Sequence, residues 1–265
     1  MEQEKGKKAL LVVSFGTSHA ATRPRTIEAV EDDLRRAFPD RAFYRSWTSG
    51  MIRRKLEREE GVKIDSVAEA LERMLAEGVT DVLIQPTHLL PGDEYRRTEE
   101  SVRACAGRFG SLALGRPLLA GESDVAELAR ILEEAYPTAE GELLVLMGHG
   151  SAGLDFPAYA ELERQFRADG CPRVCIGTVE FAPGIAPVLT RVRQEQPRRV
   201  CLAPLLAVAG DHVMNDMAGD EPDSWKNQIS REGPEVDCRL TGLAELAAVR
   251  ELYVRHARAA QAVTV

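Results

Sequence analysis

Two segments, VLIQPTHLLPGDEYRR at residues 82–97 and VCLAPLLAVAGDHVMN at residues 200–215, align with each other without gaps. Each begins with an apolar run rich in β-branched and other strand-forming residues, which is typical of a buried strand. Each then reaches Gly-Asp followed by a titratable residue, Glu94 in the first segment and His212 in the second. A repeat of this kind predicts that the chain contains two copies of one structural unit.

Strand-like runs alternate with amphipathic helical stretches along nearly the whole chain, which indicates parallel sheets built from β-α-β units. The expected strands are 9–15, 42–47, 81–88 and 112–119 in the first half, and 142–151, 173–180, 198–208 and 236–243 in the second. The expected helices are 22–38, 50–59, 66–78, 124–136 and 249–260. Ser66 and Glu69 form the pattern of a capping box at the start of the third helix. The sequence thus predicts an α/β fold of two similar doubly wound domains, residues 1–125 and 126–265, each with a small, mainly parallel four-stranded sheet.

Composition and charge exclude several classes of function. The net charge of −8 argues against a nucleic-acid partner, which would require a basic face to neutralise phosphates. No window approaches the run of about 18 apolar residues that a membrane span needs, and no secretory signal is recognisable at the N-terminus. The five cysteines form no CxxC pair, so we expect reduced thiols and a cytoplasmic protein.

Three residues suited to metal binding follow strands of the second half. His149 comes after LLVLM, Glu180 closes RVCIGTVE, and His212 follows CLAPLLAV. Because ligands of open α/β sheets bind at the carboxyl ends of the strands, these side chains converge if the three strands are neighbours. Two imidazoles and one carboxylate suit borderline divalent ions such as cobalt, iron, nickel or zinc. The sequence therefore predicts a metal site, with Asp211 as a carboxylate that orients an imidazole.

A similar turn opens both halves. Ser14-Phe15-Gly16-Thr17 aligns with Gly148-His149-Gly150-Ser151, so that Phe15 stands where the second half has His149. Glycines in these turns allow a bulky planar ligand to approach the backbone closely. The segment SFGTS at 14–18 has one glycine and lacks the lysine of a P-loop, so we expect no nucleotide. Its hydroxyls fit a hydrogen-bonding rim for carboxylates better.

The remaining histidines are weaker candidates for the site. His88 ends a strand of the first half, but its counterpart in the repeat is Leu206, which favours a packed position. His19 lies in a loop, where it either approaches a ligand or is solvated. His256 lies on the last expected helix and is expected at the surface.

Several motifs resemble those of the anaerobic sirohydrochlorin cobaltochelatases of cobalamin biosynthesis, a family of class II chelatases. They are KKALLVVSFGTS at 7–18, TSGMI at 48–52, GDEY at 92–95, MGHG at 147–150 and VAGDHVMNDMAGDEPDSWK at 208–226. The resemblance extends from about Lys7 to about Tyr253, and its motifs are long and occur in a fixed order. It implies two similar α/β domains that face a central cleft, in which a tetrapyrrole binds.

The resemblance also implies a function and a set of site residues. In the family two histidines and a glutamate take up the metal, and the matching residues are His149, Glu180 and His212. The implied enzyme is a lyase-type metal chelatase that inserts Co2+, its substrate metal, into sirohydrochlorin or a precorrin-2-type tetrapyrrole as two pyrrole protons leave. One of the two histidines would accept a proton, and a homo-oligomer is expected. The residues expected to contact the tetrapyrrole are Ser14, Phe15, Thr17, Ser18 and Glu94, with Arg53 or Arg54 as carboxylate partners.

Three other functions remain open at this point. The same ligands would serve a sirohydrochlorin ferrochelatase that makes sirohaem, because they do not separate cobalt from iron. A non-catalytic carrier of a tetrapyrrole or a metal would use the same site without turnover. A periplasmic-type solute-binding protein shares the two-lobed plan, but the histidines at the strand ends and the missing export signal count against it.

Overall fold

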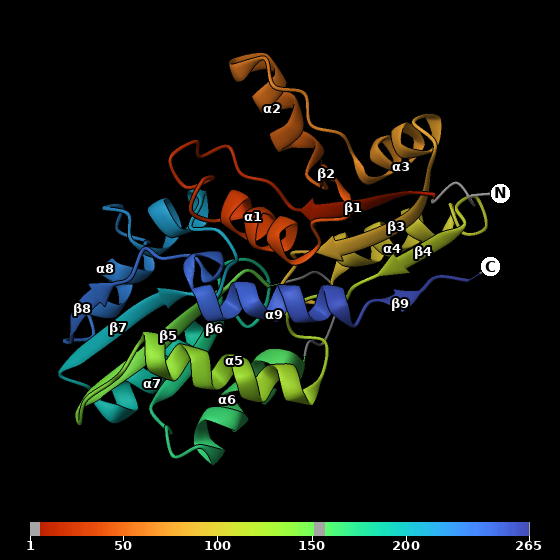
Figure 1. Cartoon of the computed structure of the whole chain (residues 1–265). Helices are drawn as coiled ribbons and strands as arrows, with labels where there is room; N and C mark the ends of the chain where they lie inside the picture. Colours follow the sequence, from red (N-terminus) through yellow and green to blue (C-terminus); the bar gives the residue numbers. More distant parts are fainter. Residues whose placement is uncertain (1–5, 151–156, 265) are drawn as a thin grey trace. The chain divides into compact units, whose positions relative to one another are not determined.

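The computed structural model describes residues 6–150 and 157–264, which form two compact units (Figure 1). The first unit comprises Met1–Ala120 and Arg250–Val265, and the second comprises Gly121–Val249. This division differs from the expected domains in two respects: the boundary falls after residue 120 instead of 125, and the C-terminal segment belongs to the first unit. The physical reason is strand pairing: β9, Gln261–Ala262, pairs antiparallel with β4, Ser111–Leu114.

The first unit contains a five-stranded sheet with the order β2-β1-β3-β4-β9. The four expected strands are present as β1, Lys7–Ser14, β2, Ala42–Trp47, β3, Val79–Pro86, and β4, and all four are parallel. Its helices are α1, Ile27–Ala37, α2, Gly50–Glu60, α3, Val67–Ala76, α4, Asp93–Arg103, and α9, Ala247–Arg258, which begins in the second unit. The predicted capping box is confirmed, with the amide of Glu69 donating to Ser66 Oγ and the amide of Ser66 donating to the Glu69 carboxylate.

The second unit contains a parallel four-stranded sheet with the order β6-β5-β7-β8. Its strands are β5, Glu142–Gly148, β6, Val174–Thr178, β7, Arg199–Pro204, and β8, Glu235–Cys238. Its helical segments are α5, Glu122–Ala135, α6, Pro157–Ala168, α7, Ala186–Glu195, η1, His212–Met217, α8, Trp225–Ser230, and η2, Leu243–Glu245. Apart from β9, the two sheets have the same strand order, as the predicted duplication requires.

Backbone hydrogen bonds beyond the strand ends show the duplication in detail. The amide of Thr48 donates to the carbonyl of Ser14 at 2.9 Å, and the amide of Val179 donates to that of Gly148 at 2.8 Å. The next pair is equivalent too, because Ser49 donates to Phe15 at 3.1 Å and Glu180 donates to His149 at 2.9 Å. These bonds place Ser49 of the first unit at the position of Glu180 in the second.

The core of each unit lies on both faces of an interior strand of its sheet, β1 in the first unit and β5 in the second. The residues of β1 from Ala9 to Val13 and of β5 from Leu143 to Met147 are buried, because β-α-β crossovers cover both faces of a parallel sheet with helices. One expectation about burial is wrong: His256 on α9 is 3% exposed. It follows Leu252 and Tyr253 by four and three residues, a spacing that puts it on their buried helix face.

Two further findings concern the cysteines and the helices. All five cysteines are free. Among the residues that the structure describes, no helix has the length and apolar character needed to cross a membrane.

Candidate metal centre

The three expected ligands meet at the carboxyl edge of the second sheet. His149 directly follows β5, Glu180 lies two residues beyond β6, and His212 begins η1 after β7. In the order β6-β5-β7 the chain connects β5 to neighbours on both of its sides. A sheet of this kind opens a crevice where the direction of winding reverses, at the carboxyl ends of the strands. The fold therefore brings together side chains that are far apart in the sequence.

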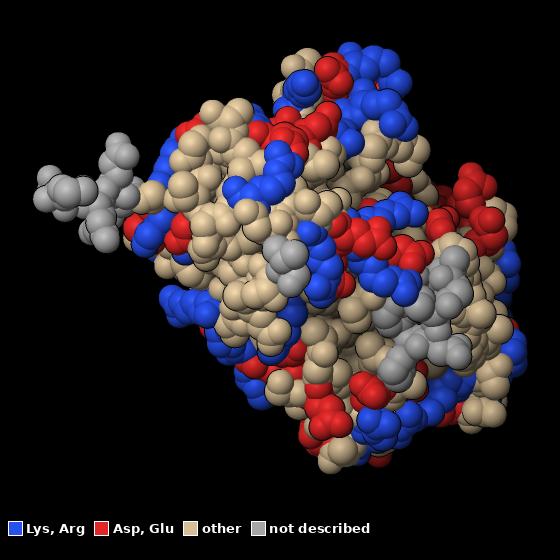
Figure 2. Space-filling model, turned by 90° about the vertical axis from the view of Figure 1, so that its right-hand side faces the viewer, with Lys and Arg blue, Asp and Glu red and all other residues tan. Residues whose placement is uncertain are grey.

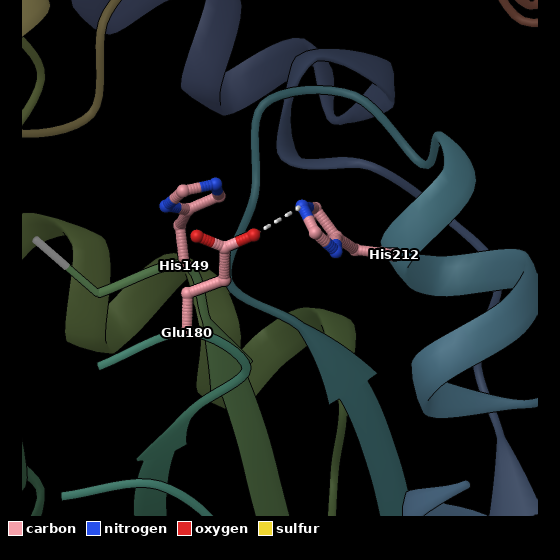
Figure 3. Close-up of side chains that lie close together, drawn as sticks. All are labelled: His149, Glu180 and His212. Carbon is pink, nitrogen blue, oxygen red and sulfur yellow. Dashed lines mark ion pairs between the residues drawn. The ribbon is translucent and has the colours of Figure 1, made fainter. Parts of the chain in front are cut away.

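The geometry of the cluster suits one shared ion. Each residue offers one ligand atom, and these atoms lie within 4.8 Å of one another. Figure 3 shows the carboxylate of Glu180 between the two imidazoles, with its Oε1 atom 3.8 Å from Nε2 of His212. The two imidazole rings are 5.1 Å apart between centroids and nearly perpendicular, at 79°. Ligand atoms on a common first-row ion lie at most about 4.2 Å apart, so small side-chain rotations would close the site around a metal.

The turn at His149 requires two glycines. Gly150 has φ of +89°, and a Cβ atom there would lie 2.0 Å from the backbone oxygen of Glu180. At Gly148 a Cβ atom would lie 2.7 Å from the ring of Tyr159. Burial raises the pKa of Tyr159 to about 12, against the opposing effect of the nearby backbone of Gly150 and His149. The turn that carries His149 is thus packed against Glu180 and Tyr159, so a Cβ atom at Gly148 or Gly150 would not fit without a shift of these neighbours.

The loop that carries Glu180 is fixed by Thr178. The hydroxyl of Thr178 donates to the carbonyl of Phe181 at 3.1 Å and accepts from the amide of Gly184 at 3.0 Å. Phe181 has φ of +61°, a backbone conformation that is unfavourable for a residue with a Cβ atom and that often occurs at functional sites. Its side chain is nonetheless 52% exposed. The loop therefore holds Glu180 in place and leaves an aromatic ring open to solvent beside it.

His212 begins a single turn of π-helix. The amide of Ala218 donates to the carbonyl of Val213, five residues earlier, and such turns are frequent at functional sites. The carboxylate that contacts the His212 ring belongs to Asp216, whose Oδ2 atom lies 2.8 Å from Nδ1. Sequence reasoning named Asp211 as a carboxylate that orients an imidazole, which stays a prediction, and it missed Asp216, four residues after the histidine. The spacing i, i+4 is the sequence signal that would have found it.

Hydrogen bonds define which nitrogen of each imidazole is free. Nδ1 of His149 lies 3.0 Å from the carbonyl oxygen of Gly150, and Nδ1 of His212 faces the carboxylate of Asp216. Carbonyl and carboxylate oxygens only accept, so in a neutral ring both Nδ1 atoms carry the hydrogen. The lone pair is then on Nε2, which is the arrangement that a metal ligand needs.

The first unit uses most of its expected hydroxyls internally. Ser14 and Thr17 are buried. The Ser14 hydroxyl accepts from Thr87 at 2.9 Å, and the Thr17 hydroxyl accepts from the amide of His19 at 3.1 Å. Ser18 is partly exposed and accepts from Nζ of Lys55 at 3.3 Å. Lys55, which the sequence did not single out, therefore lies beside the one hydroxyl of this turn that a ligand can reach.

The other expected residues of the first unit differ in whether they are exposed and in whether an ion pair already engages them. Phe15 is exposed. Glu94, in the first turn of α4, pairs with Arg97 at 3.3 Å. Arg53 is engaged by Glu69 at 2.9 Å, whereas Arg54 is exposed and forms no ion pair within residues 6–150 and 157–264. Figure 2 shows acidic and basic side chains interspersed on the face in view, with basic side chains of α2 at its top.

His88 lies just beyond β3 and is not part of the cluster. Both of its ring nitrogens are buried and have no hydrogen-bond partner among the described residues. Burial lowers the pKa of His88 to about 4. These features agree with a packed position, as the alignment with Leu206 predicted.

Comparison with known proteins places the chain among metal chelatases. The profile of the cobalt chelatase (CbiK) family matches residues 8–262. A sirohydrochlorin cobaltochelatase of Salmonella typhimurium is 41% identical over 251 residues, covering 94% of this chain and 95% of the relative. The sirohydrochlorin cobaltochelatase CbiKC of Nitratidesulfovibrio vulgaris is 33% identical over 261 residues, covering 96% and 90%.

Solved structures with low sequence identity share the fold. SirB from Bacillus subtilis with Fe3+ superposes with a TM-score of 0.67 at 17% identity, covering 95% of this chain and 94% of that chain. CbiX, described as the terminal enzyme of sirohaem biosynthesis in denitrifying bacteria, superposes with a TM-score of 0.57 at 19% identity, covering 96% and 100%. At these identities the likeness concerns the fold alone.

Proposed function

The chain belongs to the cobalt chelatase (CbiK) family, and from this premise we propose that it inserts Co2+ into sirohydrochlorin. The two relatives that are similar over nearly their whole length are named sirohydrochlorin cobaltochelatases. The observation that supports the proposal most directly is the convergence of His149, Glu180 and His212, with ligand atoms within 4.8 Å of one another.

Co2+ is a substrate in this reaction, and the three side chains are proposed to hold it before transfer. Two imidazole nitrogens and a carboxylate oxygen match the preference of a borderline divalent ion. Three protein ligands leave coordination positions open, which the ring nitrogens of the tetrapyrrole can occupy. Glu180 and His212 are 48% and 34% exposed, so their ligand atoms are accessible from solvent.

Insertion must also remove two protons from the tetrapyrrole for each Co2+ that enters. As the ion moves to the ring nitrogens, its bonds to Nε2 of His149 and His212 break, and the freed lone pairs become available to accept protons. The hydrogen bonds at Nδ1 keep both rings in the tautomer that this transfer requires. One imidazole can thus serve first as a ligand and then as a proton acceptor.

Both units offer residues for binding a flat ring with peripheral carboxylates. In the second unit Phe181 and Met214 are 52% and 46% exposed, and they follow Glu180 and His212 by one and two residues. Sequence reasoning missed both, although large apolar residues in loops beside ligands are a usable signal. In the first unit we assign ring contact to Phe15 and carboxylate contact to Ser18, Lys55 and Arg54, because these groups are accessible.

The test follows the absorption change of sirohydrochlorin on addition of Co2+ and purified protein. We expect many product molecules per chain, whereas a carrier would give at most one. H212A should abolish insertion while circular dichroism shows a retained fold. Insertion by H212A at the parent rate would refute the assigned site. A parallel assay with Fe2+ measures how far the protein discriminates between the two metals.

A further inference from the structure

We propose that Asp216 is a positioning residue that holds the His212 imidazole with Nε2 directed at the metal. This inference rests on the proposed function, because it assigns His212 to Co2+ binding. Its basis is the contact between Asp216 Oδ2 and His212 Nδ1, at 2.8 Å. Asp216 itself does not contact the ion in this proposal.

The His212 ring lies between two carboxylates. Its Nδ1 atom faces Asp216, while its Nε2 atom lies 3.8 Å from Oε1 of Glu180. The contact with Asp216 therefore fixes the rotation of the ring that turns Nε2 toward the other two ligands. Without it, the ring could rotate and present Nδ1, or adopt the tautomer in which Nε2 carries the hydrogen and cannot bind a metal.

The two histidines of the site are held in different ways. His149 Nδ1 faces the carbonyl oxygen of the next residue, Gly150, so the turn of the backbone supplies its partner. His212 depends on a side chain from the same π-helical turn. Only the partner of His212 is an ionised acceptor, which strengthens the hydrogen bond and the donor power of the opposite nitrogen. His212 is thus the ligand whose affinity a single substitution outside the cluster can change.

The contact contributes little to folding. Asp216 and His212 are 50% and 34% exposed, and exposed pairs of this kind add little to stability. A role in metal binding therefore predicts a loss of Co2+ affinity without a loss of stability. A merely structural role predicts the opposite.

The test measures Co2+ binding alone, with no tetrapyrrole present. Co2+ is titrated into the full chain, its d–d absorption bands report the coordination geometry, and thermal unfolding reports stability. We expect D216A to raise the Kd for Co2+ by about 10- to 100-fold and to change the d–d spectrum. D216N should lose less affinity, because its amide oxygen can still accept from Nδ1.

D220N is the matched control, because it removes the same charge four residues further along the chain, beyond η1. Asp220 pairs with Lys226 at 2.9 Å instead of with His212, so we expect a Kd within about 2-fold of the parent. A parent-like Kd and spectrum in both Asp216 variants would overturn the proposal, as would an equal loss in D220N. If D216A does not fold, the Kd for Co2+ and the d–d spectrum of D216N decide whether the proposal holds.

H212A separates the failure of this inference from the failure of the proposed function. If H212A binds Co2+ as tightly as the parent, the ligand assignment is wrong, and the proposed function loses its site. If H212A loses affinity and the Asp216 variants do not, the ligand assignment stands and only the positioning role is refuted.

Discussion

After β1 the chain places Phe15 at the position where, after β5, it places His149. The glycines that follow, Gly16 and Gly150, both have positive φ, +102° and +89°. Backbone hydrogen bonds from Ser49 to Phe15 and from Glu180 to His149 are equivalent. The two turns therefore have the same backbone conformation and differ in the side chains that they present.

The same difference recurs at the other two ligand positions. Ser49 stands in place of Glu180 and caps α2 by accepting from the amide of Ile52. Glu94 stands in place of His212 by the sequence repeat and pairs with Arg97. The backbone of the turn thus forms without ligands in the first unit. It follows that the proposed metal cluster is not needed to hold this backbone, so its residues can be exchanged between the units in experiments.

The largest expected effect comes from giving the second unit the residue of the first. His149→Phe should lower Co2+ affinity by at least about 100-fold, because it removes a ligand outright, while the fold persists as it does around Phe15. Titration with Co2+ and circular dichroism measure the two quantities. The matched exchange, Phe15→His, should create no second Co2+ site, because Ser49 offers no carboxylate. If His149→Phe binds Co2+ as tightly as the parent, His149 is not a ligand and the proposed difference between the two turns is wrong.

The next effect concerns the two glycines. In Gly150→Ala, the new Cβ atom would lie 2.0 Å from the Glu180 backbone oxygen. We expect a loss of about 4 kcal/mol in the free energy of unfolding, from left-handed backbone strain and overpacking. Gly16→Ala places Cβ 2.7 Å from the Trp47 ring and should also destabilise.

Co2+ affinity distinguishes these two glycine variants. Only Gly150→Ala displaces Glu180, so only this variant should lose affinity, and urea unfolding with Co2+ titration tests both. An equal loss of Co2+ affinity in the two variants would contradict the prediction that only the turn of the second unit affects Co2+ binding.

The third effect concerns acid stability. The pKa of His88 is about 4 in the folded state, against about 6.5 in the unfolded chain. As the pH falls below 6.5, the unfolded chain binds the proton first, so stability decreases until the pH reaches about 4. The loss from this group is about 3 kcal/mol.

His88→Leu, which introduces the residue found at the matching Leu206, should remove this pH dependence. Urea unfolding at pH 7 and pH 4, compared between parent and variant, measures it. Identical pH profiles would contradict the assignment of the acid sensitivity to His88.

The smallest effect concerns Tyr159. Tyr159→Phe removes a buried hydroxyl that packs beside Gly148 in the turn at His149, which should lower the free energy of unfolding by about 1 kcal/mol. It should also weaken Co2+ binding a few-fold, because the turn at His149 loosens. Tyr44→Phe is the control, since its hydroxyl donates to Glu77 at 2.6 Å in the first unit. Tyr44→Phe should lower the free energy of unfolding by a similar amount and leave Co2+ binding unchanged.

Much of the fold could be predicted from the sequence because its signals are local. Apolar runs indicated β1 to β8, and the repeat of Gly-Asp after β3 and β7 indicated the duplication. The two-residue strand β9 was missed, because so short a segment has no periodicity. His256 was misplaced because an amphipathic helix was treated as though its histidine must face water.

The residues of the candidate site also differ in whether a local sequence signal indicates them. His149, Glu180 and His212 could be found because each follows a recognisable strand. Tyr159 could not, because its contact with the His149 turn depends on how α6 packs. Asp216 was missed, although its i, i+4 spacing from His212 on a helical turn is a signal that indicates it.

The pairing of β9 with β4 has a consequence for the order of events during synthesis. The second unit is one continuous stretch, so every residue it needs has been translated once residue 249 has been added to the chain. The first unit must wait for residues 250–264, whose Arg250 and Tyr253 bind Asp33 and the carbonyl of Thr87. The half of the chain that is translated first thus receives its last residues only after the whole second unit has been translated.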